Sequence, residues 1–291
     1  MHKKFEGRAR GLAIAVLATA ATLAFATTAS ATLEPISSVT LQSGGGTALW
    51  DAETEYACLP GVLADSPVAN GSFNAQSDAF DGGLLLNVFA ASPGYVGFSD
   101  GDGQGNHVGQ SLTIGPRTLL GLRVTRTDTG LPGSPTLRSL VKLTNTTNHK
   151  LTRAVSLCSN LGSDAASGVR ASSNGDHKLT AADRWVVTSD SATTAVDPPV
   201  THVFSGKGAL RVTKTGFCAP TGAQSDCVGQ ELKFTLGGGK TRYLLFYAEM
   251  HGTNGSAITG ASKYNNKNLT AALRSGLSQT VRSRVLNWDL G

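Results

Sequence analysis

The sequence predicts an all-β protein, an antiparallel β-sandwich with a short helical segment at its C-terminal end. The chain has 291 residues, of which 35 are glycine and only 15% are charged, a composition that favours short strands joined by turns. Apolar and polar residues alternate from about residue 32 to residue 251, as in strands with one buried face. The apolar spacing changes to three or four residues only in the last forty residues.

Residues 1–31 have the three parts of a secretory signal peptide. A basic start (Met1–Arg10) is followed by an apolar stretch (Gly11–Ala26) and by the small residues Ala29–Ala31. We expect cleavage before Thr32 and a secreted, extracellular protein, with residues 32–291 forming a single β-sandwich domain. The apolar stretch is shorter than the roughly 20 residues of a membrane-spanning helix, and no transmembrane segment is expected after its removal.

The balance of charge argues against nucleic acid as a partner. The whole chain has 25 Lys and Arg against 20 Asp and Glu. Four basic residues and one acidic residue lie in the predicted leader, so the remainder carries 21 against 19. A nearly neutral chain lacks the charge that would draw it to a nucleic acid.

The alternation predicts two hairpins and one central strand. One hairpin would join residues 137–143 to residues 151–157, and the other would join residues 232–236 to residues 242–248. Glycine in the second turn (Gly237–Lys240) supplies the positive φ angles that tight turns need. The run Tyr243–Tyr247 is apolar on both faces, which predicts a central strand.

The C-terminal residues carry one apolar stripe at helical spacing, which predicts helix near residues 256–289. Gly276 is expected to break this helix, and Ser278 to cap the second piece. The stripe consists of Leu269, Leu273, Leu277, Val281, Val285 and Trp288.

All four cysteines follow the predicted leader, and an even number in an exported chain favours disulfides. Cys218 and Cys227 enclose a short loop rich in turn formers, so we expect them to pair. The second disulfide would then join Cys58 to Cys158. The alternative is that one pair remains as buried thiols. No C-x-x-C or H-x-x-x-H spacing suggests a zinc site.

One segment is similar to the first half of a calcium-binding loop. Oxygen-bearing side chains occur at alternate positions in Asp100, Asp102, Gln104 and Asn106, and Gly105 occupies the position of the sharp turn. Ser111 stands where such a loop has a bidentate glutamate, so any calcium affinity should be weak. The alternative is a Gly-Asp turn between strands, with no cofactor.

Two further groups of residues are candidates for binding or catalysis. Asp183, Arg184 and Trp185 combine an acid, a guanidinium and an aromatic ring, which together suit a sugar. The alternative is a core Trp at the start of a strand, with Asp183 and Arg184 as an outward surface pair. Glu249 and His251 have the same parity near the end of a predicted strand, so they are expected to share a face.

Several segments together resemble an uncharacterised β-sandwich module of exported bacterial proteins. The resemblance implies a fold and an extracellular setting, and no activity or site residues. The segments are Asp78–Gly82, Asn160–Asp164, Ala182–Thr188, Asp197–His202 and Gly276–Asp289.

The sequence therefore predicts an exported, disulfide-stabilised β-sandwich with a binding or structural role at the cell surface or in the medium. A glycan or another cell-surface component is the expected partner. The rival hypothesis is a carbohydrate-active enzyme that uses carboxylates near an exposed aromatic residue. A groove that brings Trp185 beside two carboxylates would favour the enzyme.

Overall fold

The computed structural model describes residues 32–59, 62–90, 95–99, 102–209, 213–218 and 226–290. The predicted signal peptide lies outside these residues. In the described part of the chain no helix has the length and apolar character needed to cross a membrane.

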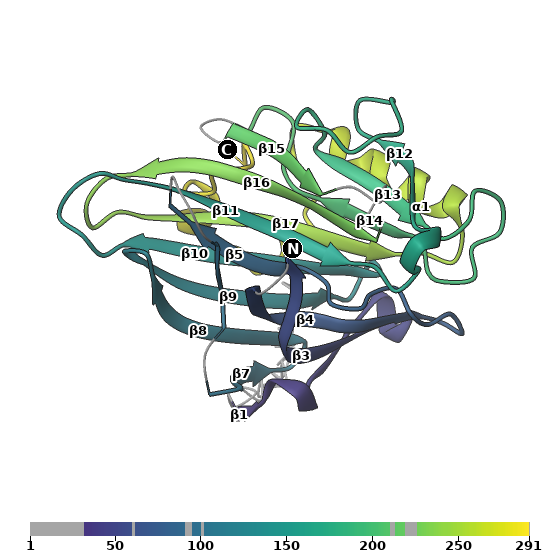
Figure 1. Ribbon diagram of the computed structural model, residues 1–291, viewed down its shortest axis with the longest axis horizontal. Coiled ribbons are helices and arrows are strands. Elements are labelled where there is room, and N and C mark those ends of the chain that lie inside the picture. The colour runs from purple at the N-terminus through teal and green to yellow at the C-terminus, as the bar shows by residue number, and fades with distance from the viewer. Residues whose placement is uncertain are drawn as a thin grey trace, which may run out of the picture. The chain divides into compact units, whose positions relative to one another are not determined.

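The strands form three antiparallel sheets, which confirms the predicted fold class (Figure 1). The largest sheet has nine strands in the order β1-β7-β8-β9-β10-β17-β14-β13-β12. Their bounds in that order are Thr32–Pro35, Gln104–Val108, Ser111–Leu119, Leu122–Leu131, Thr136–Asn145, Thr241–Met250, Val200–Val203, Trp185–Ser189 and Gly168–Ser172.

The second sheet has five strands in the order β15-β16-β11-β5-β6, and the third has three in the order β2-β3-β4. The five-stranded sheet comprises Thr213–Cys218, Cys227–Leu236, Leu151–Asn160, Leu85–Phe89 and Tyr95–Gly97. The three-stranded sheet comprises Thr40–Ser43, Ala48–Leu59 and Val62–Phe73.

The helices are short. Within the described residues, four 3₁₀ turns span Ile36–Ser38 (η1), Gly44–Gly46 (η2), Asp164–Ala166 (η3) and Ser262–Asn265 (η4). The α-helices are Asn254–Ala261 (α1) and Gln279–Arg282 (α2).

The two faces of the nine-stranded sheet are covered by different parts of the chain. Its inner face packs through Leu137 and Phe246 against residues of the other two sheets, such as Val155 and Trp50. The outer face of β17 is covered by the C-terminal segment, which packs Leu273 and its neighbours against it. Strand β17 is therefore buried on both faces over most of its length, as its continuous apolar run predicted.

Both predicted hairpins are wrong. The strands β10 and β11 lie in different sheets, and so do β16 and β17. Each connection instead crosses from one sheet to the other, so the two strands it joins face each other across the core. The Asn145 side chain holds the two crossings together by donating to the carbonyls of His149 (2.7 Å) and Leu236 (3.1 Å).

The apolar stripe at the C-terminus packs as predicted, although little of it is helical. Leu269, Leu273 and Leu277 are buried, but the chain around them forms turns. Gly276 has a φ of 73° and breaks the segment, and Ser278 caps α2 through its side chain, both as predicted. Asn287 is fully buried, and its side chain bonds to the backbone of β17 as a neighbouring strand would. Its Oδ1 atom accepts from Leu245 N, and its Nδ2 atom donates to the Leu245 and Phe204 carbonyls.

Candidate functional site

Asp183 and Trp185 of the predicted sugar-binding cluster are buried, while Arg184 between them is half-buried and donates from Nη2 to Asn265 Oδ1 at 2.7 Å. Trp185 opens β13, is only 5% exposed, and donates from its indole nitrogen to Asn265 Oδ1 at 3.1 Å. Asp183 is fully buried and accepts from backbone and side-chain donors of Ser173, Asn174 and Thr180. The expectation of an outward Asp183–Arg184 pair is therefore wrong for Asp183, and Trp185 offers no ring face to a sugar.

The last three residues of the segment proposed for calcium belong to a strand. Gln104 and Asn106 belong to β7, which pairs with β1, and Asp102 Oδ1 accepts from Gln104 N at 3.0 Å. Asp100 lies outside the described residues. Among the residues that the structure does describe, no group of three or more His, Cys, Asp or Glu side chains could hold a metal ion. The calcium site stays a prediction.

The disulfides also stay predictions, because the side chains of Cys58 and Cys218 lie outside the described residues. Cys158 is buried in β11, where the Asn87 Nδ2 atom lies 3.9 Å from its sulfur. Cys227 is buried at the start of β16.

Glu249 is the centre of a buried polar cluster under η4. Its Oε1 atom accepts from Thr136 Oγ1 (2.5 Å), Tyr264 OH (2.8 Å) and Lys263 Nζ, and its Oε2 atom lies 3.5 Å from His251 Nε2. Burial alone would raise the pKa of Glu249, but His251, Lys263 and Thr136 outweigh it and hold the pKa below its usual value. Glu249 and His251 do meet, as parity predicted. They line neither the three pockets described below nor a fourth one, which lies on the five-stranded sheet between Phe89, Arg153 and Glu231.

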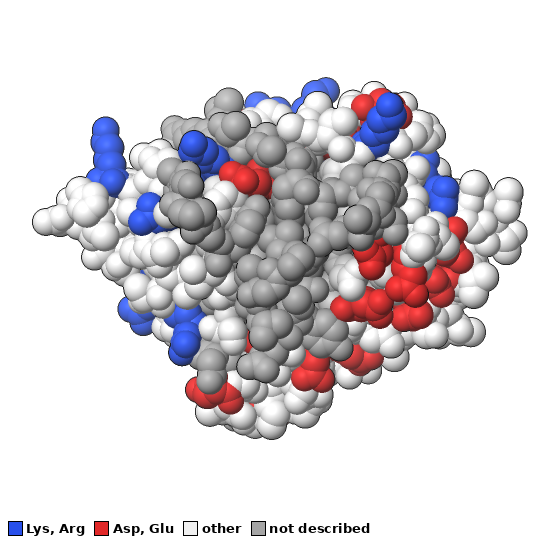
Figure 2. Space-filling model, in the orientation of Figure 1, with Lys and Arg blue, Asp and Glu red and all other residues white. Residues whose placement is uncertain are grey.

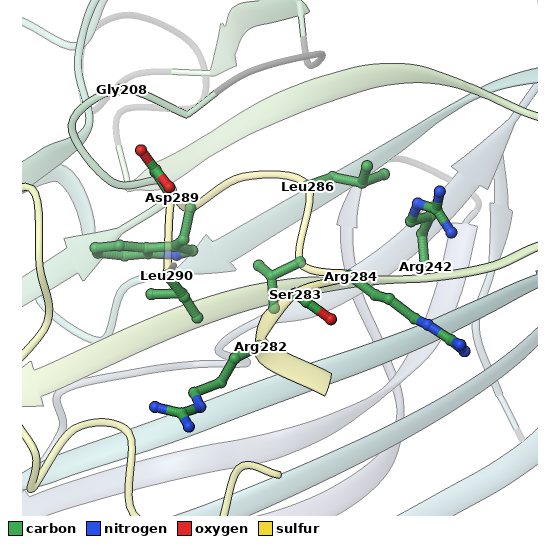
Figure 3. Close-up of a pocket in the computed structure, with 10 residues that line it drawn as sticks. Gly208, Arg242, Arg282, Ser283, Arg284, Leu286, Asp289 and Leu290 are labelled. Atoms are coloured by element: carbon green, nitrogen blue, oxygen red, sulfur yellow. The ribbon is translucent and has the colours of Figure 1, made fainter. Parts of the chain in front are cut away.

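A different part of the nine-stranded sheet is hollowed and basic. The first pocket, of about 260 Å³, lies between the end of α2 and the start of β17 (Figure 3). Arg242 and Arg284 lie on one side of it and Arg282 on the other. Val285, Leu286, Trp288 and Leu290 give it an apolar wall.

Two more pockets lie near this one, each sharing lining residues with the next. A pocket of about 570 Å³ shares Arg242 and Arg284 with the first and adds Lys240 and Thr241. A third, of about 480 Å³, shares Thr241 and is lined by Arg123, Lys142 and three other residues, two of them threonines. We call this run of three pockets the basic track.

The cations of the basic track have no carboxylate partner in the described part of the chain. The ion pairs there involve other basic residues (His107, Arg126, His251, Lys263 and Lys267). Asp289 is the one acid among the residues that line the three pockets, and Lys267 Nζ already lies 2.8 Å from its carboxylate. The track is therefore free to take up an anion.

No protein-family model matches the sequence, and no curated protein matches it. Solved structures do. A polysaccharide lyase is similar with a TM-score of 0.42 and 10% identity over 72% of this chain and 33% of that chain. A protein described as a kojibiose phosphorylase from the human microbiome is similar with a TM-score of 0.38 and 9% identity over 79% of this chain and 33% of that chain. The chain spans about a third of the length of each, and likeness this distant indicates nothing about ligand or activity.

The opposite end of the sheets is acidic. Figure 2 shows the largest group of Asp and Glu at the right of the visible face, while Lys and Arg lie along its left edge and also at the top and upper right. Burial and the neighbouring Asp190, Asp78 and Asp164 raise the pKa of Asp197 to about 6. Burial also raises the pKa of Asp81, with Asp78, Asp164 and Asp226. We call these six aspartates the acidic end.

Three of the segments behind the resemblance, Asp78–Gly82, Asn160–Asp164 and Asp197–His202, lie at the acidic end, whereas Gly276–Asp289 contributes to the basic track. Asp81 N donates to the Asn160 carbonyl at 3.1 Å, and Asn160 N donates to the Gly82 carbonyl at 2.9 Å. The Pro199 carbonyl accepts from His251 N at 3.0 Å. The Asp-rich motifs of the sequence thus mark one end of the sandwich, while the basic track lies at the other.

The sequence pattern gave no indication of the basic track. Arg123, Lys142, Arg242 and Arg284 come from separate segments, and each alone is typical of a solvated strand or turn residue. The one local signal is Arg282-Ser283-Arg284, which follows the Ser278 cap. The pairing of β9 with β10 brings Arg123 and Lys142 to one face of the sheet, and the hydrogen bond from Tyr243 N to the Arg284 carbonyl brings residue 284 beside the start of β17, where Arg242 lies.

Proposed function

We propose that this protein is a binding protein for an anionic glycan, which it takes up outside the cell in the basic track. The observation that carries the proposal is three pockets with shared lining residues, whose Arg and Lys side chains have no carboxylate partner among the described residues. Arginine suits planar carboxylates and sulfates, because its guanidinium can donate two parallel hydrogen bonds.

Threonine hydroxyls favour a glycan over other polyanions. Thr125, Thr144 and Thr241 lie among the cations of the track, and the Thr144 and Thr241 hydroxyls are 2.8 Å apart. Hydroxyls of this kind both donate and accept, as sugar hydroxyls do. The residues that line the two polar pockets include no aromatic ring on which a base could stack.

No observation favours the rival enzyme. Trp185 is buried, and each of the four pockets has at most one carboxylate in its lining, whereas glycoside hydrolysis uses a pair. Gly97–Gly101 has the G-x-S-x-G spacing of a nucleophile elbow. Gly97 ends β6, Asp100 and Gly101 lie outside the described residues, and the next described element is the strand β7, whereas the elbow requires a strand, a turn and a helix.

The test compares wild-type protein with a double variant, Arg242→Gln with Arg284→Gln. Binding to polygalacturonate and heparin is measured by titration calorimetry, with neutral dextran and duplex DNA as comparison ligands. The double variant should bind the acidic polysaccharides at least tenfold more weakly, because it loses two charge-assisted contacts. The matched control, Lys178→Gln with Lys233→Gln, removes the same charge outside the track and should bind as wild type does.

Two results would overturn the proposal. One is wild-type protein that binds neither acidic polysaccharide, or that binds DNA more tightly than both. The other is an equal loss of affinity in the control variant, which would show attraction to net charge rather than to the track.

A further inference from the structure

The outer face of β8 and β9 carries a row of hydroxyls. Thr113 of β8 is paired with Thr127 of β9, and residues paired across an antiparallel sheet share a face. Ser111 is paired with Thr129 in the same way. The two hydroxyl oxygens of each pair are 2.9 Å apart, and all four side chains are half-exposed. We call these two pairs, together with Thr125, the hydroxyl shelf.

The hydroxyl shelf continues from one pocket of the basic track. Thr125 lines the pocket of about 480 Å³ together with Arg123 and Lys142, and it is paired with Lys142 across the sheet. Side chains of a strand alternate between its faces, so Thr127 and Thr129 follow Thr125 on the same face of β9. The pocket and the shelf therefore form one surface, with cations at one end and hydroxyls along the rest.

The shelf itself holds no charge. Arg126 and Asp128 of β9 point to the opposite face, where both are fully buried and form an ion pair. On β10, Arg138 is paired with Thr129, but it is buried and donates to the Ser275 carbonyl at 2.5 Å. The C-terminal segment thus covers this part of β10 and lies as a wall beside the shelf.

Each hydroxyl pair has bonding capacity left for a ligand. A hydroxyl has one donor and two acceptor positions, and the bond within a pair uses one donor and one acceptor. One O–H donor and three acceptor positions remain in each pair. Sugar hydroxyls both donate and accept, whereas a carboxylate only accepts and would meet a single donor in each pair. The shelf therefore suits uncharged sugars better than acidic ones.

We propose that the hydroxyl shelf binds uncharged sugars of a glycan whose acidic end lies in the pocket with Arg123 and Lys142. This inference rests on the proposed function and names its ligand class, a chain with an acid at one end followed by neutral units. Arg123 and Thr129 are six residues apart on β9. Their separation along the strand is therefore about 20 Å, which is close to the length of about four linked pyranose rings.

The test uses cello-, xylo- and manno-oligosaccharides of two to six units, each oxidised at the reducing end to an aldonic acid. Every member of a series has one carboxylate, and only its neutral part grows. In titration calorimetry, the affinity for at least one series should rise with each unit up to about four and then level off. The same oligosaccharides without oxidation should bind about tenfold more weakly or worse, because they lack the charge-assisted contact.

Thr127→Val and Thr129→Val test the shelf directly. Each should lower the affinity for the longer oxidised oligosaccharides about three- to tenfold and leave the affinity for the shortest unchanged, because one hydrogen-bonding hydroxyl is lost. Valine retains the branched shape that favours a strand. The matched control is Thr235→Val, since the Thr235 hydroxyl pairs with that of Thr152 at 2.8 Å on the five-stranded sheet. This control should bind as wild type does.

The outcomes separate the two proposals. Failure of polygalacturonate, heparin and every oxidised oligosaccharide to bind would overturn the proposed function. Binding of the acidic polysaccharides, with no dependence on length in any oxidised series, would overturn this inference alone. So would a Thr127→Val variant that melts at a lower temperature but binds the longer oligosaccharides as Thr235→Val does, because its hydroxyl would then serve the sheet and not a ligand.

Discussion

The buried carboxylate of Glu249 is held by several polar side chains. Its carboxylate is fully buried and contacts a threonine, a tyrosine, a lysine and a histidine from three separate segments. Removal of a charge with several hydrogen bonds leaves its buried partners unsatisfied. This cluster fastens η4 to the nine-stranded sheet.

Glu249→Gln should lower the free energy of unfolding by about 2–3 kcal/mol at neutral pH, since bonds to a charged acceptor are lost. The pKa of Glu249 is lower in the folded chain than in the unfolded one. Its stabilisation is therefore present above the ordinary carboxyl pKa and is lost as the pH falls through the folded value. In urea unfolding, the difference in free energy of unfolding between Glu249→Gln and wild type should become smaller as the pH is lowered.

The control for this prediction is Glu53→Gln, because the Glu53 side chain bonds only to the next backbone amide among the described contacts. Its effect should stay within about 0.5 kcal/mol. Equal destabilisation by both substitutions would show that the buried cluster has no special role.

At the scale of elements, the crossings between the sheets depend on close backbone contact. A Cβ atom at Gly238 would lie 2.5 Å from the carbonyl carbon of Asn148, in the neighbouring crossing. Gly238→Ala should therefore destabilise the protein by about 1–3 kcal/mol, because the two backbones must separate.

Gly255→Ala is the matched comparison. Gly255 lies in α1, and a Cβ atom there would have no neighbour within 4 Å. This substitution should stabilise the protein by about 0.4–1 kcal/mol. The measurement is the midpoint of urea unfolding. If both variants shift it in the same direction, the backbone contact at Gly238 is not the cause of the destabilisation.

These crossings also show how far the sequence determines the fold. Alternation correctly predicts strands, their buried faces and the central place of β17, because burial is a local property of each side chain. The same alternation fits a hairpin and a crossing between sheets equally well. The choice is made by tertiary contacts such as that of Asn145 with Leu236, which no local pattern contains.

Local sequence patterns predict the candidate site less well than they predict the fold. The sugar-binding prediction for Trp185 rested on an exposed ring, but Asn265, eighty residues away, bonds its indole nitrogen in the interior. The basic track is assembled from residues up to 161 positions apart, Arg123 and Arg284, so it follows from topology alone.

At the scale of the whole molecule, burial and then like-charge repulsion disfavour the ionised carboxylates of the acidic end. The pKa of Asp197 is about 6 in the folded chain, above its unfolded value. Stability from this group is therefore complete at low pH and is lost as the pH rises through about 6. Asp197→Asn should raise the melting temperature at pH 7 and have little effect near pH 3.5.

Asp176→Asn should change the melting temperature at pH 7 in the opposite direction. Asp176 is exposed, and the backbone amide of Lys178 lowers its pKa, so its charge is favoured in the folded state. This variant should melt below wild type at pH 7. A lower melting temperature for Asp197→Asn at pH 7 would show that the six aspartates do not repel one another.

The separation of the basic track from the acidic end has a further consequence for motion near a charged surface. A chain with little net charge but opposite charges at its two ends has an electric dipole along the strands. Close to a negatively charged surface, the field exerts a torque that turns the basic end inward and the acidic end outward. The protein would then reach the surface with its basic track facing it, because molecules that approach in other orientations are rotated before they make contact.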